Sequence, residues 1–322
     1  MRVLVTGGTG FLGSHLVEAL LERPGAEVYA LVRDPSKPRW LSETGGARLI
    51  AGDLGSVPGL PAGLTCVYHL AGLTKTHRTN EYYTVNREGT ANLLRALEGQ
   101  TGPVRFVHLS SLAAAGPAPD LAGIGEDAPP RPNSPYGQSK LQAEQEVLKR
   151  RDRFSVVILR AAAIYGPRDE DFLEFMRWVR RGVKPVIGRQ VLSLLYVRDA
   201  VRACLLAGAA GRPSGEIFNI ADPRPYGWDD ISRIAARHLR KKIVPVRLPV
   251  WTAYLAALTS AGLGRLRGGG DSVFNLSKVK QMKQDWIADP GKARRDLGFE
   301  TVFSLEQGLS ETIAWYKWKG WL

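Results

Sequence analysis

The chain has 322 residues, with 44 lysines and arginines against 31 aspartates and glutamates, so its formal net charge at pH 7 is +13. This excess lies in one half, because residues 1–146 carry 13 basic and 14 acidic side chains, whereas residues 147–322 carry 31 and 17. Hydrophobic residues make up 44% of the chain, and its glycines and prolines show no repeat, which excludes disordered and fibrous proteins. A chain of this length is expected to form one large domain and a smaller lobe.

The cysteines and the N-terminal segment indicate the compartment. Cys66 and Cys204 lie in apolar runs, which excludes a disulfide framework and is typical of a reducing environment. The N-terminal residues MRVLVTGG predict a strand and a turn rather than a signal peptide, so we expect a cytoplasmic protein. The apolar stretch Leu248–Leu266 contains proline and glycine, which favours a buried or surface-lying helix over a membrane span. The five histidines show no ligand spacing, so we expect no metal site.

The first half of the chain alternates apolar runs with segments of helical period. Runs that are apolar throughout are typical of parallel strands covered on both faces of a sheet. Because crossovers between parallel strands are right-handed, this alternation predicts an α/β fold with a Rossmann-type, doubly wound parallel sheet. The expected strands are Arg2–Thr6, Glu27–Arg33, Ala47–Ala51, Thr65–Leu70 and Val104–Leu109, and the expected helices are Phe11–Arg23 and Asn80–Glu98.

The second half is less regular. Its expected elements are strand Phe154–Arg160, helix Asp171–Arg181, strand Val191–Val197, helix Asp199–Leu206 and strand Glu216–Ile220. We expect residues 1–165 to form the sheet domain, with residues 191–222 returning to it. Residues 166–190 and 223–322 then form a smaller, mostly helical lobe.

A glycine-rich turn follows the first strand. Gly7 permits a tight turn, Gly10 lets the backbone approach a pyrophosphate, and Gly13 lets the following helix pack against the strand. The N-terminus of that helix supplies N–H groups and a positive dipole for phosphates. Residues 1–165 are therefore predicted to bind a dinucleotide. The residues expected to contact it here are Gly7, Gly10, Phe11, Leu12 and Gly13.

The end of the second strand bears on the choice of dinucleotide. Val32 occupies the position where an acidic residue would bind the ribose 2′-hydroxyl, and Arg33 follows it, with Lys37 one turn further on. A guanidinium group matches a 2′-phosphate, which favours NADP over NAD. Asp34 keeps NAD open, and Arg33 and Lys37 as solvated loop charges are the alternative. Asp53 with Leu54, after the third strand, is expected to meet the adenine ring.

Tyr136 and Lys140 stand four residues apart in a segment with helical period, so both lie on one helix face. A phenol has a pKa of about 10, which a nearby ammonium group lowers, so the pair is suited to acid–base chemistry. Upstream, the strand Val104–Leu109 runs into Ser110 and Ser111 at the carboxyl edge of the sheet, where ligands bind in open α/β folds. A serine hydroxyl there can hydrogen-bond a substrate oxygen.

Short motifs of one kind extend along nearly the whole chain. They are TGGTGFLG at 6–13, GDL at 52–54, HLAG at 69–72, VNREGTANLL at 85–94, HLSSLAAAG at 108–116, YGQSK at 136–140, LRAAAIYGPRD at 160–169, YVRDAVRA at 196–203 and FNIAD at 218–222. In these motifs the sequence resembles the extended short-chain dehydrogenases/reductases. That branch includes sugar-nucleotide epimerases, 3β-hydroxysteroid dehydrogenases and dihydroflavonol reductases.

The resemblance implies roles for individual residues. Tyr136 would be the catalytic acid and base, Lys140 would lower its pKa and anchor the ribose, and Ser111, rather than Ser110, would bind the substrate oxygen. Asn86 would make a structural bond to the backbone. The further cofactor contacts that the resemblance implies are Ala71, Gly72 and Ile164.

Two positions weigh against a sugar-nucleotide substrate. Members of the branch that bind sugar nucleotides commonly hold the diphosphate with an asparagine and an arginine, and the matching positions here are Ala163 and Leu192. A diphosphate without such partners would lose its hydration uncompensated, so we expect an apolar substrate. Lys75 is a further candidate for substrate contact, beside Ser111, Ala163 and Leu192.

We therefore expect an NAD(P)-dependent oxidoreductase that transfers hydride between nicotinamide and a secondary alcohol or ketone of sterol- or flavonoid-like character. The alternative is a nucleotide-sugar epimerase or dehydratase with tightly bound NAD(P), in which Arg168, Arg189 or Lys278 holds the diphosphate.

The basic runs lie at helix ends without interleaved aromatic residues, so we expect no nucleic-acid partner. A basic lobe is compatible with an anionic membrane surface, but this partner is not favoured. The resemblance also implies a homodimer, with leucines buried between paired helices of two subunits. These leucines are Leu93, Leu94, Leu97, Leu141 and Leu148.

Overall fold

The structure is a computed structural model that describes residues 1–186, 190–209, 214–247 and 284–322. The stretch Leu248–Leu266 and the residues Arg189 and Lys278 lie outside the described residues. Within the described ranges, no helix is long and apolar enough to cross a membrane. In the same ranges, no group of three His, Cys, Asp or Glu side chains is placed to hold a metal ion.

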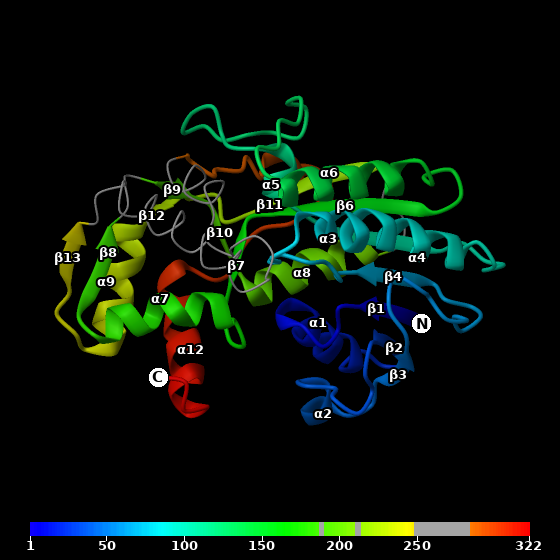
Figure 1. The fold of residues 1–322 in the computed structure, drawn as a ribbon, viewed down its shortest axis with the longest axis horizontal. Helices are drawn as coiled ribbons and strands as arrows, with labels where there is room; N and C mark the ends of the chain where they lie inside the picture. The colour runs from blue at the N-terminus through cyan, green and yellow to red at the C-terminus, as the bar shows by residue number, and fades with distance from the viewer. Residues whose placement is uncertain (187–189, 210–213, 248–283) are drawn as a thin grey trace.

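Seven parallel strands form the central sheet in the order β11-β6-β5-β4-β1-β2-β3 (Figure 1). This order reverses direction at β1, as a doubly wound sheet does, and confirms the predicted fold class. The strands are β1 (Arg2–Thr6), β2 (Glu27–Val32), β3 (Arg48–Ala51), β4 (Cys66–His69), β5 (Arg105–Ser111), β6 (Ser155–Ala161) and β11 (Glu216–Ile220).

Helices cover both faces of this sheet because its strands are apolar on both sides. Val3 and Val5 of β1 pack toward α1 (Phe11–Leu21) and α8 (Val197–Gly208). Leu4, between them, points to the opposite face, where α4 (Gly89–Leu97) and α6 (Pro135–Leu148) lie. The residues alternate between faces because successive side chains of a strand point in opposite directions.

The helix expected over Asn80–Glu98 is helical throughout but not uniform. It divides into α3 (Thr79–Tyr82), the π-helical η1 (Tyr83–Glu88) and α4. A π-helical turn is rare and is often found at functional sites. Here it includes Asn86, whose side chain is buried and bonded to a neighbouring loop.

The strand expected over Val191–Val197 is not one strand. It divides into β9 (Val191–Leu192) and β10 (Leu194–Tyr196), which pair with β12 (Tyr226–Gly227) and β7 (Ala163–Tyr165) outside the central sheet. Of the two strands expected between residues 191 and 222, only the later one, β11, joins the central sheet, beside β6.

The lobe contains the helices α7 (Glu170–Arg180), α9 (Trp228–Leu239) and α12 (Leu305–Trp318), and the short parallel pair β8 (Val183–Val186) and β13 (Val244–Arg247). Its core is continuous with that of the sheet domain, since Leu309 and Ile231 belong to the same buried cluster as Val3. The two halves of the chain therefore fold as one body around a shared core.

Three of the leucines expected between two subunits are buried within one chain. Leu93, Leu94 and Leu97 are at most 1% exposed and pack with the sheet residues Leu4 and Phe106. The expectation that they pair with a second subunit is therefore wrong, because the sheet of their own chain covers them.

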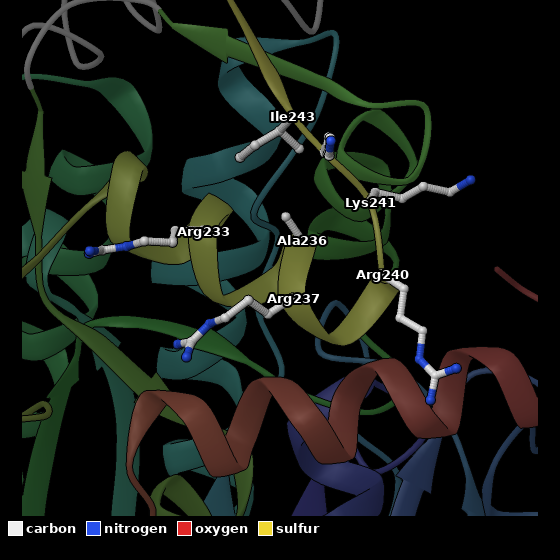
Figure 2. Close-up of a pocket in the computed structure, with 7 residues that line it drawn as sticks. Arg233, Ala236, Arg237, Arg240, Lys241 and Ile243 are labelled. Atoms are coloured by element: carbon white, nitrogen blue, oxygen red, sulfur yellow. The ribbon is translucent and has the colours of Figure 1, made fainter.

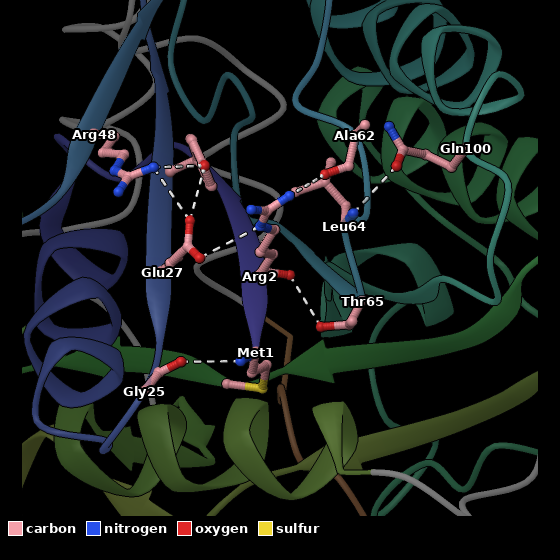
Figure 3. A network of polar contacts seen from close by, with 10 residues as sticks. Met1, Arg2, Gly25, Glu27, Arg48, Ala62, Leu64, Thr65 and Gln100 are labelled. Carbon is pink, nitrogen blue, oxygen red and sulfur yellow. Dashed lines mark hydrogen bonds and ion pairs between the residues drawn. The ribbon is translucent and has the colours of Figure 1, made fainter.

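Polar contacts fasten the amino ends of three neighbouring strands (Figure 3). The Glu27 carboxylate at the start of β2 pairs with Arg2 of β1 at 3.4 Å and with Arg48 of β3 at 3.2 Å. Arg2 Nη1 also donates to the carbonyl of Ala62 at 3.0 Å. These contacts join the strands at their amino ends, opposite to the carboxyl ends, where the predicted site lies.

A buried ion pair joins α6 to the sheet. Arg160 of β6 donates to both oxygens of Glu144, from Nε at 3.0 Å and from Nη2 at 2.7 Å, and both side chains are at most 3% exposed. We predict that Arg160→Leu lowers the free energy of unfolding by about 3–5 kcal/mol, because it leaves a buried carboxylate uncompensated. Chemical denaturation measures this loss.

The matched control is Arg150→Leu, whose partner Glu98 is partly exposed like Arg150 itself. This change should cost less than about 1 kcal/mol, because water screens an exposed pair. Equal losses in the two variants would contradict the importance of the buried pair.

Candidate functional site

The glycine-rich turn between β1 and α1 has room only for glycine at two positions. Gly7 adopts a positive φ of 75°, and a Cβ on it would stand 2.7 Å from the backbone nitrogen of Ala71. A Cβ on Gly13 would stand 2.1 Å from the carbonyl oxygen of Gly7. The turn therefore lies directly against the residues that follow β4, as the dinucleotide hypothesis requires.

The first turn of α1 is open to an anion. Its N-cap is Gly10, no side chain caps it, and the turn contains no acidic residue. Its N–H groups and dipole are therefore free to meet a phosphate, as predicted for Phe11 and Leu12. This uncapped turn and the crowded glycines fit the pyrophosphate of a dinucleotide such as NAD(P).

The charged residues after β2 lie on the surface. Arg33 is exposed, and no described residue pairs with it. Asp34 accepts hydrogen bonds from Ser36 at 3.0 Å and 2.6 Å, which is the main cause of the lowered pKa of its carboxyl group. Lys37 lies 3.6 Å from Asp34 and is largely exposed. Asp34 is thus held in a local turn, whereas Arg33 is available to a ligand.

The residues after β3 also form a local turn. Asp53 Oδ1 accepts from the backbone nitrogens of Gly55 at 2.7 Å and Ser56 at 3.0 Å. Leu54 is buried, and its carbonyl accepts from Asn92 at 2.7 Å. Their contact with an adenine ring stays a prediction.

Close packing of two helices brings Ser111 and Tyr136 together. Ser111 caps α5 (Leu112–Ala115), and its Oγ accepts from Ala113 N at 3.2 Å. A Cβ on Gly137 would stand 2.2 Å from the carbonyl oxygen of Ala113, so α6 begins in direct contact with α5. The Ser134 side chain caps α6 through Gly137 N at 3.1 Å, which places Tyr136 in its first turn.

The environment of Tyr136 favours its protonated form. Burial raises the pKa of its hydroxyl, and a side-chain hydrogen bond with Ser111 opposes that rise. The ring of Tyr82 lies 5.9 Å away, between centroids. We expected Lys140 to lower this pKa, but Lys140 is not among the groups that shift it. Burial has the largest effect, because it disfavours the charged phenolate.

Lys140 lies one turn after Tyr136 and is 5% exposed. Its Nζ donates to the carbonyl oxygen of Leu109 at 2.7 Å, and a Cβ on Gly72 would stand 3.8 Å from it. Burial lowers the pKa of Lys140 to about 8, and the Glu144 carboxylate counteracts this effect. The structure thus brings Lys140 close to Gly72, one of the residues that the resemblance expects to contact the cofactor.

Asn86 connects the loop after β4 to α6, the helix that carries Tyr136 and Lys140. Its Oδ1 accepts from Leu73 N at 2.7 Å, and its Nδ2 donates to Leu73 O at 3.1 Å and to Ser139 Oγ at 2.9 Å. Ser139 Oγ in turn donates to the carbonyl oxygen of Tyr136 at 2.7 Å. The expected backbone bond of Asn86 is confirmed, and it also holds α6 in place.

The threonine at the end of β1 fixes the start of the same segment. Thr6 Oγ1 accepts from Ala71 N at 3.2 Å and bonds His69 Nδ1 at 2.7 Å. His69 Nε2 lies 2.8 Å from Thr90 Oγ1. Both ring nitrogens of His69 have partners and the ring is fully buried. His69 therefore holds the Thr6 side chain in the position from which it bonds Ala71 N.

The residues expected to bind substrate have different environments. Ala163, on β7, is exposed, and the neighbouring Ile164 is partly exposed. Leu192 is 6% exposed and packs in the main core, so its contact with a substrate stays a prediction. Lys75 forms an ion pair with Asp171 of α7 and thereby links the loop after β4 to the lobe.

Arg168 is engaged elsewhere. Its Nη1 donates to Ser14 Oγ at 3.0 Å, its Nη2 pairs with Glu18 at 2.5 Å, and its guanidinium group lies 5.1 Å from the ring centroid of Trp40. It also has a positive φ of 74°. Arg168 thus holds α1, and its side chain is not available to hold a diphosphate.

Sequence reasoning missed several neighbours of the site. Tyr82 lies against Tyr136, and Ser139 fixes the backbone of Tyr136. The Glu144 carboxylate accepts hydrogen bonds from Arg160 and from the hydroxyl of Ser110. Ser110, the serine next to Ser111, thus binds α6 to the sheet. No local pattern marks these contacts, because each joins residues that are distant in sequence or lies within an ordinary helix.

The comparisons with known proteins agree with this geometry. The sequence profile of the NAD dependent epimerase/dehydratase family matches residues 3–221. A ceramide reductase of Caulobacter vibrioides is 31% identical, over 99% of this chain and 96% of its own length. A 3-beta-hydroxysteroid dehydrogenase of Mycolicibacterium neoaurum is 28% identical, over 98% and 91%.

Among solved structures, MoeE5 in complex with UDP-glucuronic acid and NAD superposes with a TM-score of 0.78 at 27% identity, covering 99% of this chain and 100% of that one. Profile, relatives and fold thus agree over nearly the full length. The chain belongs to the NAD-dependent epimerase/dehydratase family and is an NAD(P)-dependent oxidoreductase of the extended short-chain dehydrogenase/reductase type.

Proposed function

We propose that the protein reduces a ketone, or oxidises the corresponding secondary alcohol, on an extended apolar substrate with NADP(H). The contact between Ser111 and Tyr136, with Lys140 one turn further on, is the observation that carries the chemistry. When bound, NADP(H) supplies or accepts the hydride at its nicotinamide ring.

The chain's own residues handle the proton. In reduction, the Tyr136 hydroxyl donates its proton to the substrate oxygen, and burial supports this role because it keeps the hydroxyl protonated. Ser111 Oγ already accepts from Ala113 N, and its own O–H, which bonds Tyr136 here, would turn from Tyr136 to donate to the same substrate oxygen. The Lys140 ammonium favours the phenolate that remains on Tyr136.

Several features support an apolar substrate. Ala163 is exposed where sugar-nucleotide enzymes of the branch carry an asparagine, and Arg168 is committed to Ser14 and Glu18. The names of the two curated relatives indicate a ceramide and a hydroxysteroid as their substrates, both largely apolar compounds. An epimerase acting on a sugar nucleotide is the second candidate, because MoeE5 binds UDP-glucuronic acid in the same fold.

A substrate panel tests the proposal. We expect NADPH oxidation with sterol-, sphingoid- or flavonoid-like ketones, and Tyr136→Phe should lower turnover by about 10²- to 10⁴-fold, the range for a positioned acid. Tyr29→Phe is the control, because its hydroxyl bonds Glu27 at the opposite edge of the sheet. Wild-type turnover in Tyr136→Phe would refute the assignment.

A second experiment tests the epimerase alternative. Stoichiometric oxidised cofactor in the purified protein, with a rise in Tm on addition of UDP, would favour the epimerase over the reductase.

Arg33 is the reason for proposing a preference for NADP. It follows β2, the neighbour of β1, and it is exposed and has no acidic partner in the described ranges. Arg33→Ala should weaken NADP binding by about 10- to 150-fold, as expected for a charge-assisted hydrogen bond, and should leave NAD binding nearly unchanged. Titration with both cofactors measures the ratio, with Arg39→Ala as a control that breaks an exposed pair with Glu170. An unchanged ratio in Arg33→Ala would show that Arg33 is a solvated charge.

The alkaline limb of the pH profile should report Lys140. Its pKa is about 8, so the ammonium is lost as the pH rises through that value, and kcat/KM for ketone reduction should fall above it. Glu144→Gln removes a carboxylate that raises this pKa, so the limb should move to lower pH. Glu146→Gln, on the same helix but paired with Arg87 and Lys149, should leave it in place. A limb that does not move in Glu144→Gln, in protein that circular dichroism shows to be folded at the assay temperature, would contradict this electrostatic role.

A cytoplasmic location and a homodimer stay proposals. Cys66 and Cys204 are buried free thiols, which supports a reducing compartment. Burial raises the pKa of each thiol to about 12, so neither is suited to act as a nucleophile. Leu141 and Leu148 of α6 keep partial exposure, so any helix pairing between subunits would use these residues.

A further inference from the structure

The far end of the lobe joins two basic segments. The backbone nitrogen of Val244 donates to the carbonyl oxygen of Gly182 at 2.9 Å, and a Cβ on Gly182 would stand 3.1 Å from the carbonyl oxygen of Lys242. The turn after α7 and the turn after α9 therefore lie side by side. Figure 1 shows β8, β13 and α9 at one end of the molecule, away from β1, β2 and β3.

These segments hold many cations and few anions. Residues 175–186 contain four basic and no acidic residues, and residues 231–247 contain six basic and no acidic residues. Five of these cations line a cavity of about 390 Å³ on α9 and the turn that follows it, namely Arg233, Arg237, Arg240, Lys241 and Lys242. Figure 2 shows Arg233 and Arg237 along α9, and Arg240 and Lys241 after its end, where these two side chains point in different directions.

Only part of this charge is neutralised within the chain. Arg233 pairs with Asp230, and Arg237 pairs with Glu306 of α12 at 2.8 Å. Arg240, Lys241 and Lys242 are exposed, and no acidic residue of the described ranges pairs with them. The negative end of the helix dipole favours cations within the last turn of α9, but these three residues follow that turn.

Exposed apolar side chains lie beside these cations. Trp178 is 46% exposed, and the Arg181 guanidinium group lies 5.7 Å from its ring centroid. Val244 and Val246 are 65% and 41% exposed and stand two residues apart on β13, so they share one side of that strand. Contacts thus run without a break from Trp178 through Arg181 and Gly182 to Lys242 and Val244.

We propose that this surface, formed by Trp178, Arg181, Arg240, Lys241, Lys242 and Val244, docks the enzyme on a membrane that contains anionic lipids. Unpaired lysines and arginines are attracted to anionic headgroups, and tryptophan prefers the interface between headgroups and acyl chains. Aliphatic side chains at the same surface gain an apolar partner from lipid. A nucleic-acid backbone would neutralise the cations but would offer Val244 and Val246 no such partner.

Co-sedimentation of the full chain with vesicles tests this proposal. We expect binding to vesicles of phosphatidylcholine with phosphatidylglycerol, little binding to phosphatidylcholine alone, and weaker binding as salt is added. Replacing Arg240, Lys241 and Lys242 together by alanine should lower the partition coefficient about 100-fold, since each surface cation contributes about fivefold. Trp178→Ala should lower it severalfold.

Two matched variants control for loss of charge and of aromatic surface. Replacement of Lys149, Arg150 and Arg151 by alanine removes the same number of charges at the end of α6, where Arg150 and Lys149 already have acidic partners. Trp318→Ala removes a more exposed tryptophan on α12. Both controls should bind anionic vesicles almost as the wild type does, and circular dichroism should show an unchanged fold for all variants.

Several outcomes would overturn the proposal. Absence of binding to the anionic vesicles at low salt would do so, as would equal losses in the two triple variants. Binding of a single-stranded homopolymer by the wild type, lost in the Arg240, Lys241 and Lys242 variant while vesicles are not bound, would identify a nucleic-acid surface instead.

Discussion

At Gly137, helix α6 approaches α5 so closely that no larger residue fits, and the rest of the site depends on this contact. A Cβ there would stand 2.2 Å from Ala113 O, so the two helix starts share one fixed position. Ser111 caps one helix and Tyr136 lies in the first turn of the other, which places their hydroxyl groups together. The regular rise of α6 then carries Lys140 to Leu109 O, and Asn86 holds the same helix from the side through Ser139.

Burial has opposite effects on the two titratable groups that this contact positions. It raises the pKa of Tyr136 and lowers that of Lys140, because it penalises the charged form of each. Glu144 limits the effect on Lys140, and Arg160 and Ser110 hold that carboxylate in place. The buried pair therefore has a use beyond stability, since it helps to keep a cation inside a site that would otherwise neutralise it.

Local patterns predicted much of this arrangement. The glycine turn, the four-residue spacing of Tyr136 and Lys140 and the strand ending at Ser111 each follow from short stretches of sequence. Contacts between distant residues could not be predicted in the same way, such as Arg160 with Glu144 or Tyr82 with Tyr136. The strand expected over Val191–Val197 failed for a similar reason, because its two parts find different partners, β12 and β7, far along the chain.

The shared core links the orientation of the basic lobe to that of the sheet domain. Leu309, Ile231 and Val3 belong to one buried cluster, and Lys75 pairs with Asp171 across the two halves. A lobe packed in this way transmits its orientation to the sheet domain, because close-packed interiors resist deformation. A surface at the end of the lobe that holds the enzyme on a membrane would therefore also fix the direction of the site near Tyr136. An apolar substrate dissolved in that membrane would then meet a site whose orientation is already set, which removes part of the entropic cost of the encounter.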